Sequence, residues 1–379
     1  MKKISIIGKG TAGILSANHF ASYTKEDEVE IECYYDSSIQ EQTVGEGTTV
    51  DVPLMLNQTQ GLEFHDIFKH LNGNFKTGIH YIGWGKQDYM HTFPMPNTSI
   101  HFNAVMLQNY LKERLSDRVK FIDKNVHWTE VNTDYVIDCS GKPNNMNDYY
   151  KAKHIPVNAA TVYQCNWIVP EYTHTLCIAH KYGWIFGIPL QDRISFGYLY
   201  NSEFNTKEEI DKELQSVIQE YGYHIVDYPL ELEFKNYYKK ENFTDNVTFN
   251  GNASFFLEPM EATSIATIDE INRHAYDVIF NGYNPKVANT IYKEWFYKVQ
   301  DIITLHYLAG SQYDTEFWKH AVSLAENNFS DRTANLNVIM DSVLNNKQAF
   351  GVTNYGTWTF DSFVQNIKGL GITKETLNL

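Results

Sequence analysis

Three glycines near the beginning of the chain have the G-x-G-x-x-G spacing that lets a backbone approach a diphosphate. Gly8, Gly10 and Gly13 follow a short apolar run and precede apolar residues at helical spacing, which predicts a strand, a tight turn and a helix. In this arrangement the first glycine makes the turn, the second admits the pyrophosphate, and the third lets the helix pack close to the strand. The amides at the helix start, including those of Thr11 and Ala12, then bind the anion.

An acidic residue follows at a distance that fits the same site. Asp36 lies 23 positions beyond Gly13, at the end of the run 29–35 (VEIECYY), which predicts a second strand. A carboxylate there can accept hydrogen bonds from the hydroxyl groups of a ribose. A glycine turn in an ordinary βαβ unit is the simpler interpretation, but the position of Asp36 favours dinucleotide binding over it.

Two charged residues stand beside apolar segments. Lys76 follows Phe75 and precedes the largely apolar stretch 79–84, and a buried ammonium there would need a functional reason, although most lysines are solvated on the surface. Glu261 precedes a predicted helix, where a carboxylate can accept a proton and is also stabilised by the helix dipole. From the residues alone, a structural and a catalytic role stay open for both.

The nucleotide site must be positioned by elements from distant parts of the chain. Residues 134–141 (DYVIDCSG) predict a buried strand that ends in small residues. Residues 251–253 precede a predicted helix on which Ile265, Ile268 and Ile271 form one stripe. Contacts scattered over the beginning, the middle and the last third of the chain suit FAD, because simple NAD dehydrogenases gather theirs in one contiguous half.

The middle of the chain predicts an antiparallel sheet. The runs 183–189 and 194–200 flank the polar pair Gln191-Asp192 and predict a hairpin. We expect this sheet to form the roof of a substrate cavity. Its expected single buried face consists of Trp184, Phe186, Ile188, Ile194, Phe196, Tyr198 and Tyr200.

The expected fold class is α/β, with an FAD-binding Rossmann-like βαβ module interleaved with an antiparallel β-sheet substrate region and a C-terminal helical region, similar to flavin monooxygenases. Residues 206–222 and 283–330 predict helices, and no low-complexity linker or repeat divides the chain, so we expect one interleaved unit over 1–379. The expected FAD module covers about 1–55, 100–160 and 245–285, the β-sheet region about 56–99 and 160–244, and the helical region 286–379.

Composition narrows the classes of protein and partner. The 379 residues suffice for a substantial core, and a net charge of −15 without a basic cluster argues against a nucleic-acid partner. No run approaches the ~18 apolar residues of a membrane span, and the N-terminus lacks the apolar region of a signal peptide. Four cysteines without a C-x-x-C pair fit reduced thiols and predict no metal site. We therefore expect a cytoplasmic protein that does not bind a membrane.

Further motifs stand in a fixed order over most of the chain. They are GKGTAG at 8–13, Asp36-Ser37 followed by VGEGT at 44–48, FKTG to GW at 75–84, HTF at 91–93, GWIFGIP at 183–189, GNASFFLEPMEATSI at 251–265 and HYLAGSQYDTEFW at 306–318. In these seven places the chain resembles the flavin-dependent halogenases of the tryptophan halogenase family. Agreement at seven ordered places is hard to obtain by chance.

The resemblance implies an enzyme in which reduced FAD, oxygen and a halide ion give hypohalous acid, which halogenates an aromatic substrate of the indole or phenol type. Lys76 matches the lysine that directs the halogenating species in that family, and Glu261 matches its catalytic glutamate. The residues then expected to bind FAD are Gly8, Gly10, Thr11, Ala12, Gly13, Asp36, Gly45, Glu46, Gly47, Thr48, Trp184, Gly251, Asn252, Glu258, Pro259 and Ile265.

The same resemblance implies sites for the halide and the substrate. Thr263 and Ser264 would bind the halide through amides at the helix start, although such a pair also begins helices in purely structural proteins. His91, Phe93 and Trp295 are candidates for stacking on the substrate. In a chain with 15% aromatic residues, a core position is the default alternative for each of the three.

The sequence contains a single glycine fingerprint for a dinucleotide, and this bears on the partners that the protein needs. Because that fingerprint is committed to FAD, we expect a separate NAD(P)H-dependent flavin reductase to supply the reduced cofactor. The sequence leaves the oligomeric state open, a homo-oligomer included. A flavin-dependent aromatic monooxygenase and a non-catalytic flavin-binding protein are the alternatives, and Lys76 together with Glu261 argues against both.

Three features depart from the family pattern. Phe186 replaces the second Trp of W-x-W-x-I-P, and Ala262 replaces a common Ser after the glutamate. Only 62 positions separate Lys76 from Asp138, and the chain is shorter than typical tryptophan-specific members. If the missing residues form a lid over free tryptophan, the pocket is more open and free tryptophan is a poor substrate.

Overall fold

The computed structural model describes residues 1–40, 46–93, 97–167, 172–330, 334–345, 353 and 355–374. The chain divides into two compact units, each assembled from three separate segments. The first unit consists of Met1–Gly73, Phe102–Lys151 and Tyr237–Phe296, and the second of Asn74–His101, Ala152–Asn236 and Tyr297–Leu379. The boundaries expected from the sequence for the FAD module, the β-sheet region and the helical region remain a prediction.

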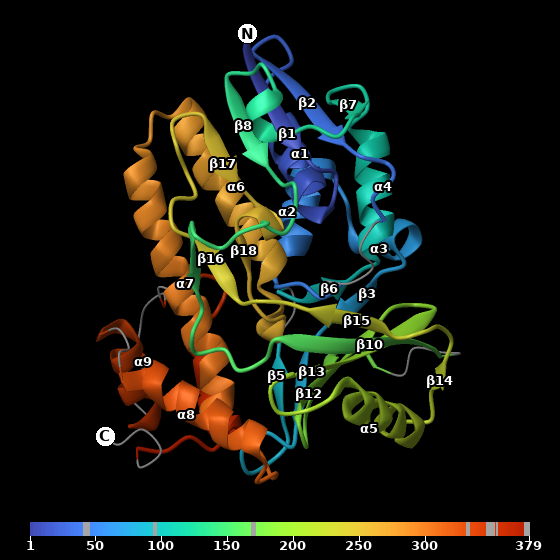
Figure 1. Cartoon of the computed structure of the whole chain (residues 1–379), viewed down its shortest axis with the longest axis vertical. Helices are drawn as coiled ribbons and strands as arrows, with labels where there is room; N and C mark the ends of the chain where they lie inside the picture. The colour runs from blue at the N-terminus through green and yellow to red at the C-terminus, as the bar shows by residue number, and fades with distance from the viewer. Residues whose placement is uncertain are drawn as a thin grey trace. The chain divides into compact units, whose positions relative to one another are not determined.

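The first unit is built on a five-stranded parallel sheet in the order β17-β8-β1-β2-β7 (Figure 1). Its centre is the predicted βαβ unit, because β1 (Lys2–Ile7) pairs in parallel with β2 (Val29–Tyr35), and α1 (Thr11–Tyr23) connects them. The remaining strands are β7 (Lys120–Asp123), β8 (Tyr135–Asp138) and β17 (Val247–Phe249).

Helices and short elements complete the first unit. Helix α1 packs against α2 (Asp51–Gln60), α4 (Ala104–Arg114) and α6 (Ser264–Phe280). On α6, the predicted stripe Ile265, Ile268 and Ile271 is buried. The other elements are α3 (Phe64–Leu71), η1 (Trp128–Glu130), η2 (Gly251–Ala253), η3 (Met260–Ala262) and a small sheet of β9 (Tyr149–Lys151), β16 (Tyr237–Lys239) and β18 (Phe255–Phe256).

The second unit contains an eight-stranded sheet in which seven strands follow the order β14-β10-β13-β12-β11-β4-β5, and β15 also pairs with β10. All pairs are antiparallel except β11 with β4, and the predicted hairpin is β12 with β13. The strands are β4 (Gly78–Ile82), β5 (Tyr89–Thr92), β10 (Ala159–Asn166), β11 (Thr175–His180), β12 (Gly183–Pro189), β13 (Arg193–Tyr200), β14 (His224–Ile225) and β15 (Leu230–Glu233).

The hairpin is confirmed, but the expectation of one shared buried face is wrong. Cross-strand partners lie on the same side of a sheet, and Tyr198 is opposite Ile185, whereas Phe186 is opposite Gly197. The side chains of Trp184, Phe186 and Ile188 therefore lie on the face opposite to that of Phe196 and Tyr198. The sequence suggested a single face because it shows the alternation within each strand and not the register between the strands.

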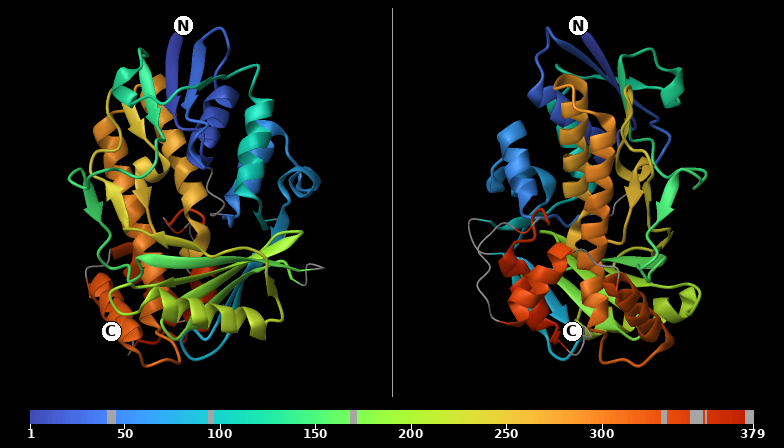
Figure 2. Two further views of the ribbon diagram at one scale, coloured as in Figure 1. Left: turned by 45° about the vertical axis from the view of Figure 1, so that its right-hand side comes forward. Right: turned by 90° about the vertical axis from the view of Figure 1, so that its left-hand side faces the viewer.

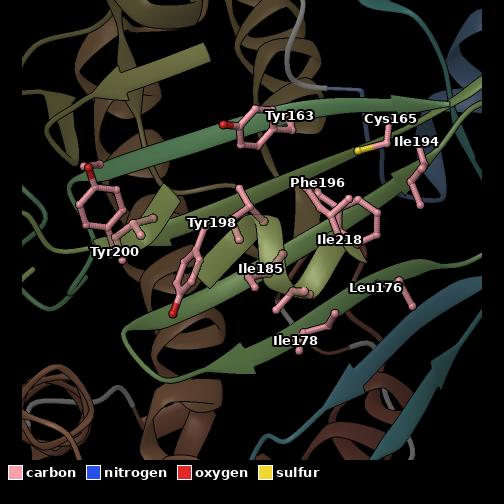
Figure 3. Close-up of a cluster of buried hydrophobic side chains, with 14 of the residues drawn as sticks. Tyr163, Cys165, Leu176, Ile178, Ile185, Ile194, Phe196, Tyr198, Tyr200 and Ile218 are labelled. Atoms are coloured by element: carbon pink, nitrogen blue, oxygen red, sulfur yellow. The ribbon is translucent and has the colours of Figure 1, made fainter. Parts of the chain in front are cut away.

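Apolar side chains cover the face that carries Tyr198. They come from four neighbouring strands and from α5 (Lys207–Glu220), which runs along this face of the sheet (Figures 2 and 3). The opposite face, which we call the Trp184 face, is also buried at Trp184 and Leu199. Both faces are thus covered, which explains why β13 has almost no exposed residue.

The rest of the second unit is mainly helical, in agreement with the C-terminal helical region predicted from sequence. Helix α7 (Pro285–Leu308) begins in the first unit and ends in the second. It is followed by α8 (Glu316–Ser330), α9 (Ala334–Leu344) and α10 (Phe360–Gly369), and a separate two-stranded ribbon pairs β3 (Asn74–Lys76) with β6 (Ser99–His101). The predicted α/β fold class is confirmed. None of the described helices is long and apolar enough to cross a membrane.

Candidate functional site

The glycine turn between β1 and α1 shows which glycines the fold itself requires. Gly8 has φ +100°, and a Cβ on it would lie 2.4 Å from the carbonyl oxygen of Cys139. A Cβ on Gly13 would lie 1.8 Å from the carbonyl oxygen of Gly8, so this glycine allows the close helix packing that its spacing predicted. A Cβ on Gly10, by contrast, would meet nothing within 4 Å. The open space at Gly10 fits a ligand that approaches the backbone.

The start of α1 offers polar groups to an anion. Its N-cap is Gly10, no side chain caps it, and its first turn contains no acidic residue. Beside it, Gln108 donates from Nε2 to the Thr11 hydroxyl over 3.1 Å. The Oε1 atom of Gln108 is buried and has no hydrogen-bond partner among the described residues. Both features fit a bound dinucleotide with an anionic diphosphate and hydroxyl groups that can donate.

Asp36 lies at the end of β2, as the spacing predicted, and its carboxylate already organises the loop. It accepts hydrogen bonds from the Ser38 amide and hydroxyl and from Asn125 Nδ2. The bonds from Ser38 hold the pKa of the Asp36 carboxyl below its usual value. The group is therefore ionised at neutral pH, as an acceptor for a ribose hydroxyl should be.

Two lysines near this loop were not found from the sequence. Lys112 Nζ donates to the hydroxyl of Tyr35 over 3.1 Å and lies 4.5 Å from the centre of its ring, while Lys9 Nζ lies 5.5 Å from the same ring. They bring two positive charges to the ring of Tyr35, the residue that precedes Asp36. The distance in sequence between Lys9 and Lys112 left no local signal for this pairing.

The expected flavin loop is described only in part. Glu46 and Thr48 are buried, and the carbonyl oxygen of Glu46 accepts a hydrogen bond from the Phe102 amide. Gly47 is half-buried. Gly45 lies outside the described residues.

A buried polar network connects the glycine turn to the segment that precedes α6. Asn250 Nδ2 donates to the Ser16 hydroxyl, to Asn272 Oδ1 and to the carbonyl oxygen of Ile268, and its Oδ1 accepts from the Gly251 amide. The Cβ that Gly251 lacks would lie 2.4 Å from the Cβ of Ala12. Gly251 and the neighbouring Asn252 are thus fixed against the start of α1.

The turn that enters α6 has an unusual backbone. Glu261 has φ 64° and Ala262 has φ 54°, which is the left-handed region that non-glycine residues seldom adopt. Glu261 is 6% exposed, and the nearby Glu258 is fully buried, whereas Pro259 is exposed. Such strained backbone often occurs at functional sites. The sequence showed the acid but not this conformation.

The candidate halide site is the start of α6. Thr263 is the N-cap residue, makes no side-chain cap and is buried, and Ser264 is the first residue of the helix. Ile265 is buried directly behind them. Trp295 is half-buried on α7 and donates from Nε1 to the hydroxyl of Thr267 over 3.0 Å, so its indole is engaged in helix packing. Its proposed contact with a substrate stays a prediction.

In the second unit, Lys76 is buried rather than solvated, with 1% of its surface exposed. Its ammonium nitrogen lies 5.6 Å from the centre of the Phe93 ring, and that ring makes an edge contact with His91 at 5.1 Å. His91 is buried and Phe93 is half-buried. The structure therefore brings together the predicted catalytic lysine and two of the predicted substrate residues.

Trp184 lies on β12, on the face that also carries His91. Phe186, two residues after Trp184 and on the same face, pairs with Cys177 on β11, and Cys177 pairs with Tyr81 on β4. Ile79 lies two residues before Tyr81 on the same face of β4 and pairs with His91 on β5. Trp184 is 2% exposed, and its Nε1 has no hydrogen-bond partner among the described residues. A ligand with a hydrogen-bond acceptor would fit this nitrogen.

The predicted residues divide between the two units. Lys76, His91, Phe93 and Trp184 belong to the second unit, and all other described candidates, Glu261 included, belong to the first. Within the described ranges, no group of three or more His, Cys, Asp or Glu residues is placed to hold a metal ion.

Comparisons with known proteins place these features in a family. The family model described as tryptophan halogenase matches residues 3–129 and 116–378. Tryptophan 7-halogenase RebH of Lentzea aerocolonigenes is 21% identical over 84% of this chain and 78% of its own length. Tryptophan 6-halogenase SttH of Streptomyces toxytricini is 28% identical, but over 40% of this chain and only 29% of that protein.

A solved structure agrees with the fold over almost the whole chain. A flavin-dependent halogenase from Xanthomonas campestris superposes with a TM-score of 0.84, covering 98% of this chain and 89% of that one at 19% sequence identity. At this identity the similarity establishes the fold, and the family match establishes the relationship.

Proposed function

This chain belongs to the tryptophan halogenase family of flavin-dependent halogenase enzymes, and from that premise we propose that it uses reduced FAD, oxygen and a halide ion to halogenate an electron-rich aromatic compound. The observation that carries the proposal is the burial of Lys76 beside Phe93 and His91. Burying an ammonium destabilises the folded protein, so a buried lysine usually serves a function. This one lies beside the rings expected to bind the substrate.

The first unit would hold FAD. The diphosphate would lie at Gly10 and the start of α1, and a ribose hydroxyl would donate a hydrogen bond to the ionised carboxylate of Asp36. When bound in its reduced form, FAD supplies with oxygen the oxidising power that turns halide into hypohalous acid.

Each charged residue would have a distinct role in halogen transfer. Lys76 would polarise or carry the halogen, because an ammonium can donate to the hypohalous acid and its amine form can become a haloamine. Glu261 would accept the proton that the aromatic carbon loses after electrophilic attack. The amides at Thr263 and Ser264 would bind the halide.

The substrate would be of the indole or phenol type. The two relatives described above are named as tryptophan halogenases, which supports an indole. The short interval between Lys76 and Asp138 supports a more open pocket, in which fewer groups grip an amino-acid backbone. Because rate depends steeply on positioning, free tryptophan should react more slowly than simpler indoles, phenols or a larger aromatic partner. Bromide or iodide should outperform chloride, since a less shielded site loses more of the reactive species to water.

Substitution of Lys76 tests the proposal. With FAD, a flavin reductase, NADH and bromide, Lys76→Ala should form brominated indole at least about 100-fold more slowly than the wild type, while reduced flavin is still oxidised at the normal rate. Lys86→Ala, which removes an exposed lysine of the same unit, is the control and should have no effect. Near-normal bromination by Lys76→Ala would exclude the lysine mechanism, and an oxygenated product without bromine would indicate a monooxygenase.

Dependence on a reductase is tested separately. The purified protein with NADH, FAD, oxygen and halide should give almost no turnover until a flavin reductase is added. Stoichiometric NADH oxidation by the isolated protein would contradict this expectation.

A further inference from the structure

The ribbon of β3 and β6 carries a polar surface that is buried instead of exposed. Asn74 pairs with His101 and Lys76 pairs with Ser99, so alternation places all four side chains on one face and Phe75 with Ile100 on the other. The four polar residues are between 0% and 9% exposed. A ribbon buried on its polar face needs partners for every polar group, because each unpaired one is destabilising.

Hydrogen bonds within the second unit account for part of this face. His101 Nε2 is 2.8 Å from the hydroxyl of Thr175, and the hydroxyl of Thr98 donates to the carbonyl oxygen of Lys76. Burial and the charge of Lys76 keep the pKa of His101 well below its usual range, so its ring is neutral. Lys76 is thus the cation of this face.

The amide group of Asn74 is only half satisfied. Its Oδ1 accepts a hydrogen bond from the Phe75 amide over 2.9 Å. Its Nδ2 is buried and has no hydrogen-bond partner among the described residues, although it could donate twice. Asn74 and Lys76 are two residues apart on one strand face, roughly 6.6 Å between their Cα atoms, a span that one small ligand can bridge.

We propose that Asn74 is a further positioning residue of the halogenation site, whose amide nitrogen donates a hydrogen bond to the oxygen of the hypohalous acid while Lys76 holds the same molecule. This inference rests on the proposed function. An N–H donor beside an ammonium attracts an acceptor that is neutral or negative, and the oxygen of hypohalous acid is both small and an acceptor.

The donor would assist the bond that breaks. As the aromatic carbon attacks, the carbon–halogen bond forms and the oxygen–halogen bond cleaves with its electron pair on oxygen. Glu261 accepts the proton that the aromatic carbon loses, and the proton then passes to the leaving hydroxide, which departs as water. Negative charge grows on that oxygen in the transition state, so a fixed N–H donor favours transfer of the halogen to the substrate over escape of hypohalous acid.

A pair of variants that differ by one hydroxyl tests this role. Asn74→Ser keeps a donor and Asn74→Ala has none. Each is assayed with FAD, flavin reductase, NADH, bromide and an indole, in the presence of excess water-soluble β-diketone that scavenges escaped hypobromous acid. The ratio of brominated indole to brominated scavenger should fall about 10-fold in Asn74→Ala and much less in Asn74→Ser. Equal ratios in the two variants would overturn the proposal.

A control variant tests whether loss of a buried polar group elsewhere in the chain also changes the product ratio. Ser5→Ala is the control, because the Ser5 hydroxyl on β1 is also buried and without a partner among the described residues. It should leave the ratio unchanged.

Different results would refute the proposed function and the proposed role of Asn74. Wild-type protein that brominates no indole or phenol under these conditions would refute the proposed function and Asn74 with it. Wild-type protein that brominates while the Asn74 variants keep its product ratio would refute only the role of Asn74.

Discussion

Helices α1 and α6 of the first unit both begin without a side-chain cap, and the chain enters them through opposite kinds of turn. Before α1 the positive φ falls on Gly8, where it costs no steric strain. Before α6 the positive φ values fall on Glu261 and Ala262, which have a Cβ, and each such residue costs roughly 1–2 kcal/mol. The first turn is therefore encoded by residue type, whereas the second must be enforced by its surroundings.

The surroundings of the second turn are rigid enough to enforce it. Asn250 and Asn272 attach α6 to Ser16 of α1 through buried hydrogen bonds, and Thr263 and Ile265 are buried on either side of the helix start. These buried contacts thus compensate for the free energy of the strained turn. The comparison suggests that the glycine turn was shaped for a close ligand, and the strained turn for aiming the carboxylate of Glu261.

The largest effect should come from filling the glycine turn. Gly13→Ala places a Cβ against the carbonyl oxygen of Gly8 and should destabilise the protein by more than about 3 kcal/mol, measured by denaturant unfolding. Gly10→Ala meets open space and should leave stability within about 1 kcal/mol, while FAD affinity in a fluorescence titration falls by about 10-fold or more. Equal FAD affinity in Gly10→Ala and wild type would mean that the open space is not the diphosphate site.

Next in size is the loss of the carboxylate at the strained turn. Glu261→Gln keeps the shape of the side chain but cannot accept a proton, so bromination of an indole should slow by about 100-fold or more. Oxidation of reduced flavin should continue at the wild-type rate, which stopped-flow absorbance measures. A variant with full halogenating activity would leave Glu261 with a structural role only.

Asp36 should have a smaller effect that is confined to FAD binding. Asp36→Ala should weaken FAD by roughly 10- to 100-fold, because a charge-assisted hydrogen bond is lost. Ser38→Ala removes only the hydroxyl that donates to Asp36 and serves as the control for loop organisation. The pKa of Asp36 is below its ordinary 3.8, so its contribution should be constant above about pH 4 and disappear only as the pH falls through the lowered value. Loss of FAD affinity between pH 7 and 5 would point to another group.

The smallest effect should be a gain in stability. Ala262→Gly relieves one strained position and should raise the unfolding free energy by up to about 1 kcal/mol, since relief of strain outweighs the entropy that glycine adds to the unfolded chain. If aiming of Glu261 depends on the stiffness of this turn, halogenation should become slower in the same variant. A loss of stability on this substitution would show that Ala262 is not strained.

The sequence anticipated elements whose signal is local. The βαβ unit, the helix with Ile265, Ile268 and Ile271 and the hairpin of β12 with β13 all follow from spacing within one segment. The sequence did not predict which face Trp184 occupies, because that depends on register with Tyr198. It also missed the pairing of Lys112 with Tyr35, which joins residues 77 positions apart.

By itself, then, the sequence determined the α/β fold class, the glycine turn at Gly8 to Gly13, the position of Asp36 and the family to which the motifs belong. These depend on residue type and on short, fixed spacings that local chemistry imposes. Only the tertiary structure decided that Lys76 is buried beside Phe93 and that Glu261 adopts a left-handed conformation. It also decided that the amide nitrogen of Asn74 lies on the same face as Lys76 without a hydrogen-bond partner among the described residues. Burial, strain and unpaired donors are properties of a residue together with its neighbours in space, and packing places those neighbours from distant parts of the chain.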